Sequence, residues 1–482
     1  MRAPLRVCGT PGDTLVVLQL PFGSFTPGQP PVEVTVNATM SNLADLNVAQ
    51  TIRSRAGFQY GNDALDNPCC DPSITNPSSI DSTTWPGTSV SPFLYSLSKV
   101  YSGPEDETAT GPNFPRRYRI EIDVAPGQTL TNLDVSDILP NNLAFAGMAG
   151  SSPAGAIVTA QPPLDVPSNA PNNLLTVRFP SVTGTTSDVD AWVDIDVYVP
   201  LNNANAQRVI NATSGDDAVV NNNAEASASW TPIDTRDPVI TATANGVGVG
   251  PEHVLQAKSI AVQKSVDIAN DVGMPNYSVG DTLEYTIEFQ ISDFFAFQNV
   301  VISDTISDGQ RFDPSFTPRL SVNGNGYVSS SAPMNAANYT VTPNYTPASP
   351  APNDGSTTFT FRVSDEMVSR GFDGTLIGGC IPEAGTGGGA PNCATYNDGP
   401  TTGTLTFRTI IQDAFSDDYP SGDPYMNSGD ILNNAVTITG DLLSETDTSV
   451  ALGTSESDSS ATSINIVFGE LSKTVYAING ST

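Results

Sequence analysis

Short runs of alternating hydrophobic and polar residues, bounded by Gly, Pro, Asn or Asp, follow one another along the chain. Typical runs are RRYRIEIDV (116–124), AWVDIDVYVP (191–200) and LEYTIEFQI (283–291). A period of two residues is that of a β-strand with one face toward a core, and no stretch keeps a helical period over about eleven residues. The pattern predicts an all-β protein made of tandem β-sandwiches of the immunoglobulin-like or Greek-key type.

The runs recur as repeats with four shared features in the same order. A run with an inward lysine comes first, at 94–103, 260–269 and 469–478. A run with a tyrosine, a run with an aspartate and a run with Asn-x-Ala follow in both complete copies. Tyr118 and Asp137 are 19 residues apart, and so are Tyr285 and Asp304. Repeats of this kind indicate tandem domains.

The repeats divide the chain into four parts. Residues 1–92 are expected to be the C-terminal part of a truncated repeat, and residues 466–482 the first strand of a further repeat. Residues 93–257 and 258–465 are expected to be full β-sandwich repeats, the second with a Gly-rich insertion flanked by cysteines. We expect the polar segments near 230–257 and 440–465 to be linkers.

Each full repeat places a lysine, an aspartate and an asparagine on the apolar side of a predicted strand. The lysines are Lys99 and Lys264, with Lys473 in the last copy; the aspartates are Asp137 and Asp304; the asparagines are Asn222 and Asn433. Burial disfavours charge, so it lowers the pKa of a lysine and raises that of an aspartate. A neutral amine is a nucleophile, and a protonated carboxyl group is a hydrogen-bond donor.

If the three groups meet, the amine can attack the asparagine side-chain carbonyl, while the carboxyl group stabilises the oxyanion and shuttles protons. The pattern therefore predicts autocatalytic isopeptide bonds, with Asp137 and Asp304 as catalysts. Simpler interpretations stay open for each single residue: a lysine that reaches solvent, an aspartate that caps a turn, an asparagine bonded to backbone. The co-occurrence of all three in both repeats favours the crosslink.

The segment KSVDIANDVGMPNYSVGDTLEYTIEFQISDFFAFQNVVISDTI, residues 264–306, resembles a conserved repeat of large bacterial and archaeal surface proteins. That repeat is related to the fimbrial isopeptide-forming domain, and the resemblance covers nearly the whole chain in register. It implies that Lys264 and Asn433 are crosslink partners, with Asp304 as catalyst. It implies the same for the residues at matching positions of the first full repeat, Lys99, Asn222 and Asp137. The first full repeat departs from the G-D-T-x-x-Y-T-I motif, because TGPNFPRRYRI stands there.

The amino-acid composition excludes several classes of function. The net charge of -32, from 51 acidic and 19 basic residues, argues against partners such as nucleic acid or anionic membranes. The single histidine, His253, argues against His-based hydrolysis, and no spacing singles out a carboxylate pair for glycoside hydrolysis. No run approaches the roughly 18 apolar residues of a membrane span. We therefore expect no enzyme beyond the autocatalysis and no cofactor, with calcium at loops 267–273 and 416–423 as an open alternative.

Five cysteines are too few for a disulfide scaffold. Cys380 and Cys393 flank a Gly-rich loop that a disulfide would close, so we expect this pair to be bonded. If Cys8 bonds to Cys69 or Cys70, the other of these two adjacent cysteines is left unpaired.

These features predict a structural segment of a large extracellular or cell-surface protein: a stalk, an adhesin or a filament stiffened by isopeptide bonds. The expected partners are neighbouring repeats of the same or an identical chain, and a host-surface or matrix ligand. One alternative is an adhesive or carbohydrate-binding module that uses long loops containing Tyr339, Tyr345 and Tyr396. Another is a head-to-tail filament joined by strand complementation through the strand of Lys473.

Overall fold

In the computed structural model of the chain, the regular secondary structure of the described residues is β-strand apart from one short helix. The structure describes residues 92–231, 242–245, 252–273, 276–327, 330–344, 355–382, 389–416 and 425–467. Before residue 92 it describes Thr35, Asn37 and the paired short strands β1 (Gln50–Ile52) with β4 (Thr88–Val90), and β2 (Phe58–Gln59) with β3 (Ser79–Ile80). The predictions for Lys473, Tyr345, Cys8, Cys69 and Cys70 lie outside the described residues.

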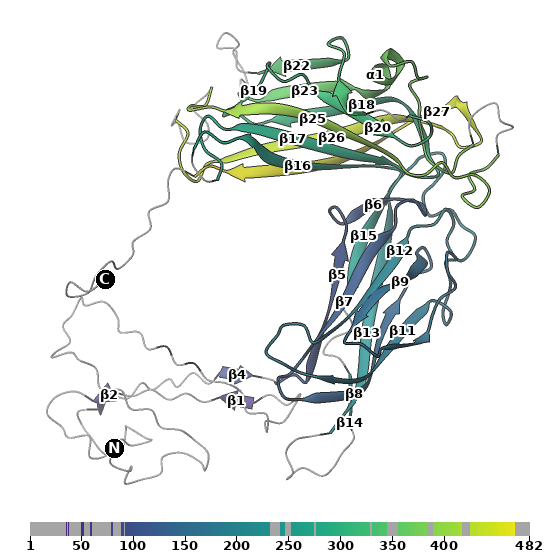
Figure 1. The fold of residues 1–482 in the computed structure, drawn as a ribbon, viewed down its shortest axis with the longest axis vertical. Helices are drawn as coiled ribbons and strands as arrows, with labels where there is room; N and C mark the ends of the chain where they lie inside the picture. Colours follow the sequence, from purple (N-terminus) through teal and green to yellow (C-terminus); the bar gives the residue numbers. More distant parts are fainter. Residues whose placement is uncertain are drawn as a thin grey trace.

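The first sandwich has two sheets (Figure 1). One runs β10 (Ile157–Ala160), β11 (Leu174–Thr183), β8 (Thr129–Ile138), β13 (Ala218–Trp230), β15 (Glu252–Lys258), β6 (Glu107–Ala109), with β14 (Ala242–Asn245) paired to β13. The other runs β5 (Tyr95–Ser102), β7 (Arg116–Val124), β12 (Ala191–Tyr198), β9 (Ala144–Ser152).

The second sandwich repeats this arrangement with more strands. One sheet runs β16 (Ile260–Asn270), β17 (Thr282–Ile291), β25 (Thr401–Ile411), β20 (Arg319–Asn323), β21 (Ala332–Pro333), with β19 (Gln310–Phe312) paired to β25. The other runs β22 (Tyr339–Pro343), β23 (Thr357–Arg362), β18 (Ala296–Ile306), β26 (Ile431–Ser444), β27 (Asp447–Asn465), with β24 (Leu376–Ile377) paired to β18. The predicted all-β sandwich class is confirmed.

Alternation along the strands explains why they form and what they bury. In β7, Tyr118, Ile120 and Ile122 are almost fully buried between the sheets, while the residues between them are more exposed. Strand β17 does the same with Leu283, Tyr285 and Ile287. One face of each strand therefore enters the hydrophobic core, as a period of two requires.

The only helix in the described part of the chain is α1 (Val363–Ser369), which follows β23 directly. It packs Val363 and Met367 into the core of the second sandwich. None of the helical structure in the described residues is long and apolar enough to cross a membrane.

The expectation of linkers near 230–257 and 440–465 is wrong where the structure describes them. Strand β15 occupies 252–258, and β27 occupies 447–465 as an edge strand paired along β26. The sequence of β27 is rich in Ser, Thr and acidic residues because most of its side chains are exposed. A polar edge strand lacks the apolar alternation by which a strand is recognised.

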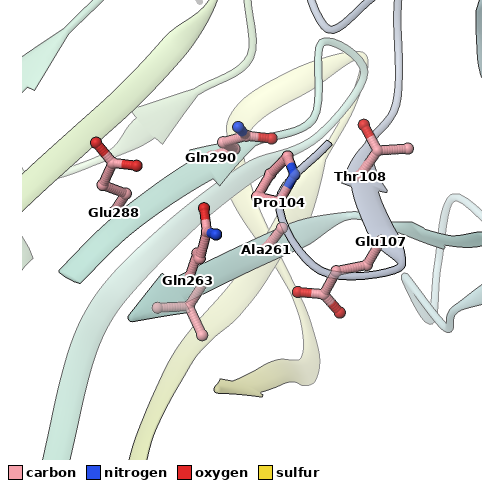
Figure 2. Close-up of a pocket in the computed structure, with 8 residues that line it drawn as sticks. Pro104, Glu107, Thr108, Ala261, Gln263, Glu288 and Gln290 are labelled. Carbon is pink, nitrogen blue, oxygen red and sulfur yellow. The ribbon is translucent and has the colours of Figure 1, made fainter. Parts of the chain in front are cut away.

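The two sandwiches meet through polar contacts around Lys258. Its Nζ lies 2.6 Å from Asp217 and 3.5 Å from Glu107 of the first sandwich. It also lies 2.9 Å from Asp458 on β27 of the second sandwich, so one lysine bridges both units. Figure 2 shows a recess at this junction, lined from both sandwiches by Pro104, Glu107, Thr108, Ala261, Gln263, Glu288 and Gln290.

Candidate functional site

The first sandwich encloses a lysine, an aspartate and an asparagine between its sheets. Lys99 on β5 donates a hydrogen bond from Nζ to Oδ2 of Asp137 on β8 at 2.8 Å, and both side chains are fully shielded from solvent. Asn222 on β13 is also fully buried. Burial raises the pKa of Asp137 and the Asn222 amide opposes that rise, which places the two groups next to each other. Neither polar atom of this amide has a hydrogen-bond partner among the described residues.

The second sandwich contains the same constellation. Lys264 on β16 donates from Nζ to Oδ2 of Asp304 on β18, and again both side chains are fully shielded. Asn434 on β26 is buried, and its amide opposes the rise in the pKa of Asp304 that burial causes. Neither amide atom of Asn434 has a hydrogen-bond partner in the described structure. An unpartnered buried amide costs about 1–3 kcal/mol, so its occurrence at both sites calls for a reason.

The strand register shows that the two sites are equivalent. Asp137 pairs across the sheet with Ala224, two residues after Asn222. Asp304 pairs with Val436, two residues after Asn434. Because residues two apart share a face, each asparagine is the diagonal same-face neighbour of its aspartate.

The expectation that Asn433 points inward is wrong, because Asn433 is exposed and Asn434 is buried. A slip of one residue exchanges the two faces of a strand. The Asn-x-Ala motif matches Asn222-Asn223-Ala224 to Asn433-Asn434-Ala435, but the structural equivalent of Asn222 is Asn434. The sequence contains the signal, since Leu432, Val436 and Ile438 form the apolar face to which Asn434 belongs.

Burial shifts the titration of all four ionisable groups toward neutrality. Burial lowers the pKa of Lys264 to about 8, although the charge of Asp304 opposes the shift. Burial raises the pKa of Asp304 to about 6, although Lys264 opposes it. The pKa of Lys99 is likewise lowered and that of Asp137 raised, in both cases chiefly by burial. At both sites, burial therefore shifts the balance away from the ion pair and toward a neutral amine and a neutral carboxyl group.

A tyrosine ring covers each lysine. The Nζ atom of Lys99 lies 4.8 Å from the ring centroid of Tyr118 on β7, and that of Lys264 lies 4.8 Å from the ring centroid of Tyr285 on β17. The hydroxyl of Tyr118 is 2.9 Å from Nδ1 of His253, a residue that the sequence analysis set aside. No local sequence signal indicates this contact, because 135 residues separate its two partners.

The cysteine and loop predictions have separate outcomes. The structure contains the Cys380–Cys393 disulfide. Tyr339 is not a loop residue: it lies in β22, with its ring 6.4 Å from that of Phe361. Tyr396 lies in a loop, where its hydroxyl donates to Oδ2 of Asp398. Of the two loops predicted for calcium, the first begins within β16, which extends to Asn270, and most of the second lies outside the described residues.

The sequence matches no family model and no curated protein. Among solved structures, the chain is similar to the pilus backbone RrgB from Streptococcus pneumoniae, with 13% identity, a TM-score of 0.21, and coverage of 37% of this chain and 31% of that chain. It is similar to the MSCRAMM ACE of Enterococcus faecalis, with 12% identity, a TM-score of 0.19 and coverage of 77% and 96%. It is also similar to BcpA, the major pilin subunit of Bacillus cereus, with 11% identity, a TM-score of 0.22 and coverage of 59% and 61%. The chain thus spans about a third of the length of the first of these proteins. TM-scores near 0.2 are too low to transfer a function to this chain.

Proposed function

We propose that each sandwich closes itself with an isopeptide bond, Lys99 to Asn222 and Lys264 to Asn434, and that the chain is a stiffened structural segment of an extracellular surface protein. One observation carries the proposal. Both sandwiches bury a lysine–aspartate pair beside an asparagine whose amide has no hydrogen-bond partner in the described structure.

The reaction balances within the three side chains. Asp304 takes a proton from the Lys264 ammonium, and the neutral Nζ attacks Cγ of Asn434 to form the new C–N bond. The protonated carboxyl group hydrogen-bonds the developing oxyanion, while a second Nζ proton passes to Nδ2. The bond from Cγ to Nδ2 breaks, ammonia leaves, and the aspartate ends protonated. The same steps apply to Lys99, Asp137 and Asn222.

This outcome removes the unfavourable features of the unreacted site. A buried ion pair loses the hydration of both charges, and the unpartnered amide adds a further cost. The reaction replaces two buried charges and a free amide by a neutral isopeptide and a protonated aspartate. Raised pKa values of Asp137 and Asp304 favour that final state.

The crosslinks would serve a mechanical role. Each joins the first strand of a sandwich to a late strand of the opposite sheet, so most of the domain lies inside a covalent ring. A charged-residue content of only 15%, a net charge of -32 and a disulfide fit an extracellular segment. Its partners would be neighbouring repeats and a surface or matrix ligand, and it would turn over no external substrate. Head-to-tail joining through Lys473 remains a prediction, since Lys473 lies outside the described residues.

Intact-mass spectrometry of the full chain tests the proposal. Each bond lowers the mass by one ammonia, about 17 Da, so two bonds lower it by about 34 Da after allowance for disulfides. Tryptic digestion should yield two branched peptides, centred on Lys99 with Asn222 and on Lys264 with Asn434. A mass equal to that encoded would overturn the proposal.

Two variants of the second site provide controls. Asp304→Ala should abolish only the Lys264–Asn434 bond, but it leaves a buried lysine unpaired and costs about 3–5 kcal/mol. Asn434→Leu removes the electrophile while keeping the Lys264–Asp304 pair, so it separates loss of the bond from loss of folding. In both variants the first bond should form as in the native chain.

A further inference from the structure

The tyrosines that cover the two lysines are held by different residues. Tyr118 and Tyr285 are almost fully buried, and their rings lie at the same 4.8 Å from the lysine Nζ. A buried hydroxyl needs a hydrogen-bond acceptor. The first sandwich supplies Nδ1 of His253 at 2.9 Å, and the second supplies Oε1 of Gln310 at 2.7 Å.

The hydrogen bonds of His253 define its neutral tautomer. Its Nε2 lies 3.0 Å from Oδ1 of Asp106, and a carboxylate only accepts, so Nε2 carries the proton. Nδ1 is then an acceptor, and the Tyr118 hydroxyl donates to it. The imidazole also stacks on Tyr101 at 4.9 Å between centroids, and His253 is the cross-strand partner of Asn222. His253 thus links the strand of the asparagine to the ring that covers the lysine.

Gln310 performs the same task with an amide. Its Oε1 accepts from Tyr285 and, at 3.2 Å, from the hydroxyl of Thr409. Gln310 lies on β19, which pairs with β25 in the sheet opposite that of Asn434. His253 lies on β15, which pairs with β13, the strand of Asn222. In both sandwiches the tyrosine hydroxyl has a side-chain acceptor, but the two acceptors come from strands at different places in the fold.

We infer that His253 and Gln310 are positioning residues for the proposed crosslinking reaction, on which this inference rests. Each fixes the tyrosine whose ring holds the lysine amine next to its aspartate and asparagine. Neither residue touches the reacting atoms. Their effect is on geometry, and a misplacement of about 1 Å can slow a reaction about a hundredfold.

The two acceptors respond differently to acid. Histidine is the side chain whose charge commonly changes between about pH 5 and pH 8, whereas an amide does not titrate there. A protonated imidazole carries a proton on both nitrogens, so Nδ1 would donate to the Tyr118 hydroxyl instead of accepting from it, and the buried hydroxyl proton would need another acceptor. The first site is therefore acid-sensitive in a way that the second is not.

The other groups around His253 do not offer a replacement acceptor. Asp106, from the β5–β6 loop, is 79% exposed and already accepts from Nε2. The Tyr101 hydroxyl, on β5, donates to the backbone oxygen of Glu107. Arg116, on β7, is a donor and interacts with Tyr101, and Glu252 on the same strand as His253 is exposed.

Cell-free synthesis of the full chain tests this inference, because the bonds then form during the measurement. Synthesis is stopped, samples are held between about pH 5 and pH 8, where imidazole changes charge, and the two branched peptides are quantified over time by mass spectrometry. The second bond is an internal standard for folding, and the His253→Gln chain separates protonation of Asp137 from protonation of the imidazole.

In the native chain, the rate of the first bond relative to the second should fall about tenfold or more as the pH is lowered through this range. His253→Gln should restore an acceptor and remove that fall. Gln310→His should transfer it to the second bond. His253→Phe keeps the stacking on Tyr101 without the acceptor and should slow only the first bond at every pH.

Two results would overturn the inference: a His253→Gln chain with the native acid response, or a His253→Phe chain that crosslinks at the native rate. If His253→Phe does not fold, His253→Gln and Gln310→His still decide. Failure of the proposed function is distinguishable, because the native chain would then yield neither branched peptide at any pH.

Discussion

A chain with both crosslinks should extend under load only outside its two covalent rings. The perturbation that tests this is a pull applied to residues 93 and 466, compared between the native chain and an Asn222→Leu, Asn434→Leu double variant. The double variant keeps both lysine–aspartate pairs and removes only the amides, neither of which has a partner in the described structure. It is therefore the closest folded match without crosslinks.

The expected lengths follow from the residue numbers. The rings lock the 123 residues from Lys99 to Asn222 and the 170 residues from Lys264 to Asn434. At about 3.3–3.6 Å per residue, these segments would release about 410–440 Å and about 560–610 Å if they were free. Ring closure of this size also limits the unfolded ensemble by about 5 kcal/mol, by analogy with a disulfide.

The segments after each asparagine stay outside the rings and can lengthen. They are the 42 residues from Asn222 to Lys264 and the 32 residues from Asn434 to Ile466. Their fully extended lengths are about 140–150 Å and about 105–115 Å. Strands β15 and β27 pair directly opposite the asparagines, His253 with Asn222 and Thr462 with Asn434, so they hold the described parts of these segments in their sheets. We expect extension there only after β15 or β27 is detached from its sheet.

Single-molecule pulling by optical tweezers or atomic force microscopy measures these lengths directly. The native chain should show two steps no longer than about 150 Å, and the double variant should add the two long releases. Releases above about 400 Å from native protein would refute the crosslinked-ring account.

Three further outcomes are expected. Asn433→Ala should leave the mass loss of two ammonias unchanged, whereas Asn434→Ala should halve it, because only Asn434 faces the buried pair; intact mass decides, and the reverse result would contradict the register. Peptide mapping without reductant should recover Cys380 joined to Cys393, and free thiols at both positions in oxidatively folded protein would contradict this. Burial and, to a smaller extent, Asp458 raise the pKa of Glu107 to about 8, so the folded chain retains a proton there that the unfolded chain has lost. Stability from this junction should be fully present below the ordinary glutamate pKa and decline as pH rises toward about 8. Urea unfolding of native protein and of Glu107→Gln tests this, and equal pH slopes would count against it.

Much of the architecture is determined by local periodicity in the sequence. Strands such as β7 and β17 are recognisable because apolar and polar residues alternate along them, and the repeats recur in register. The same alternation places Lys264 and Asp304 on inner faces, since apolar residues stand two positions before and after each. It also favours Asn434 over Asn433, against the Asn-x-Ala match, and the pairing of Val436 with Asp304 agrees with it. A strand's own pattern is enough to decide which of its side chains enter the core.

Tertiary structure alone decided which strands and side chains meet. The role of His253 depends on a contact with Tyr118 across two sheets, and the polar strand β27 exists because β26 provides a ladder for it. Periodicity specifies the face of a strand, but the partner of a side chain depends on which strands the fold brings together, and that is a long-range property of the whole sandwich.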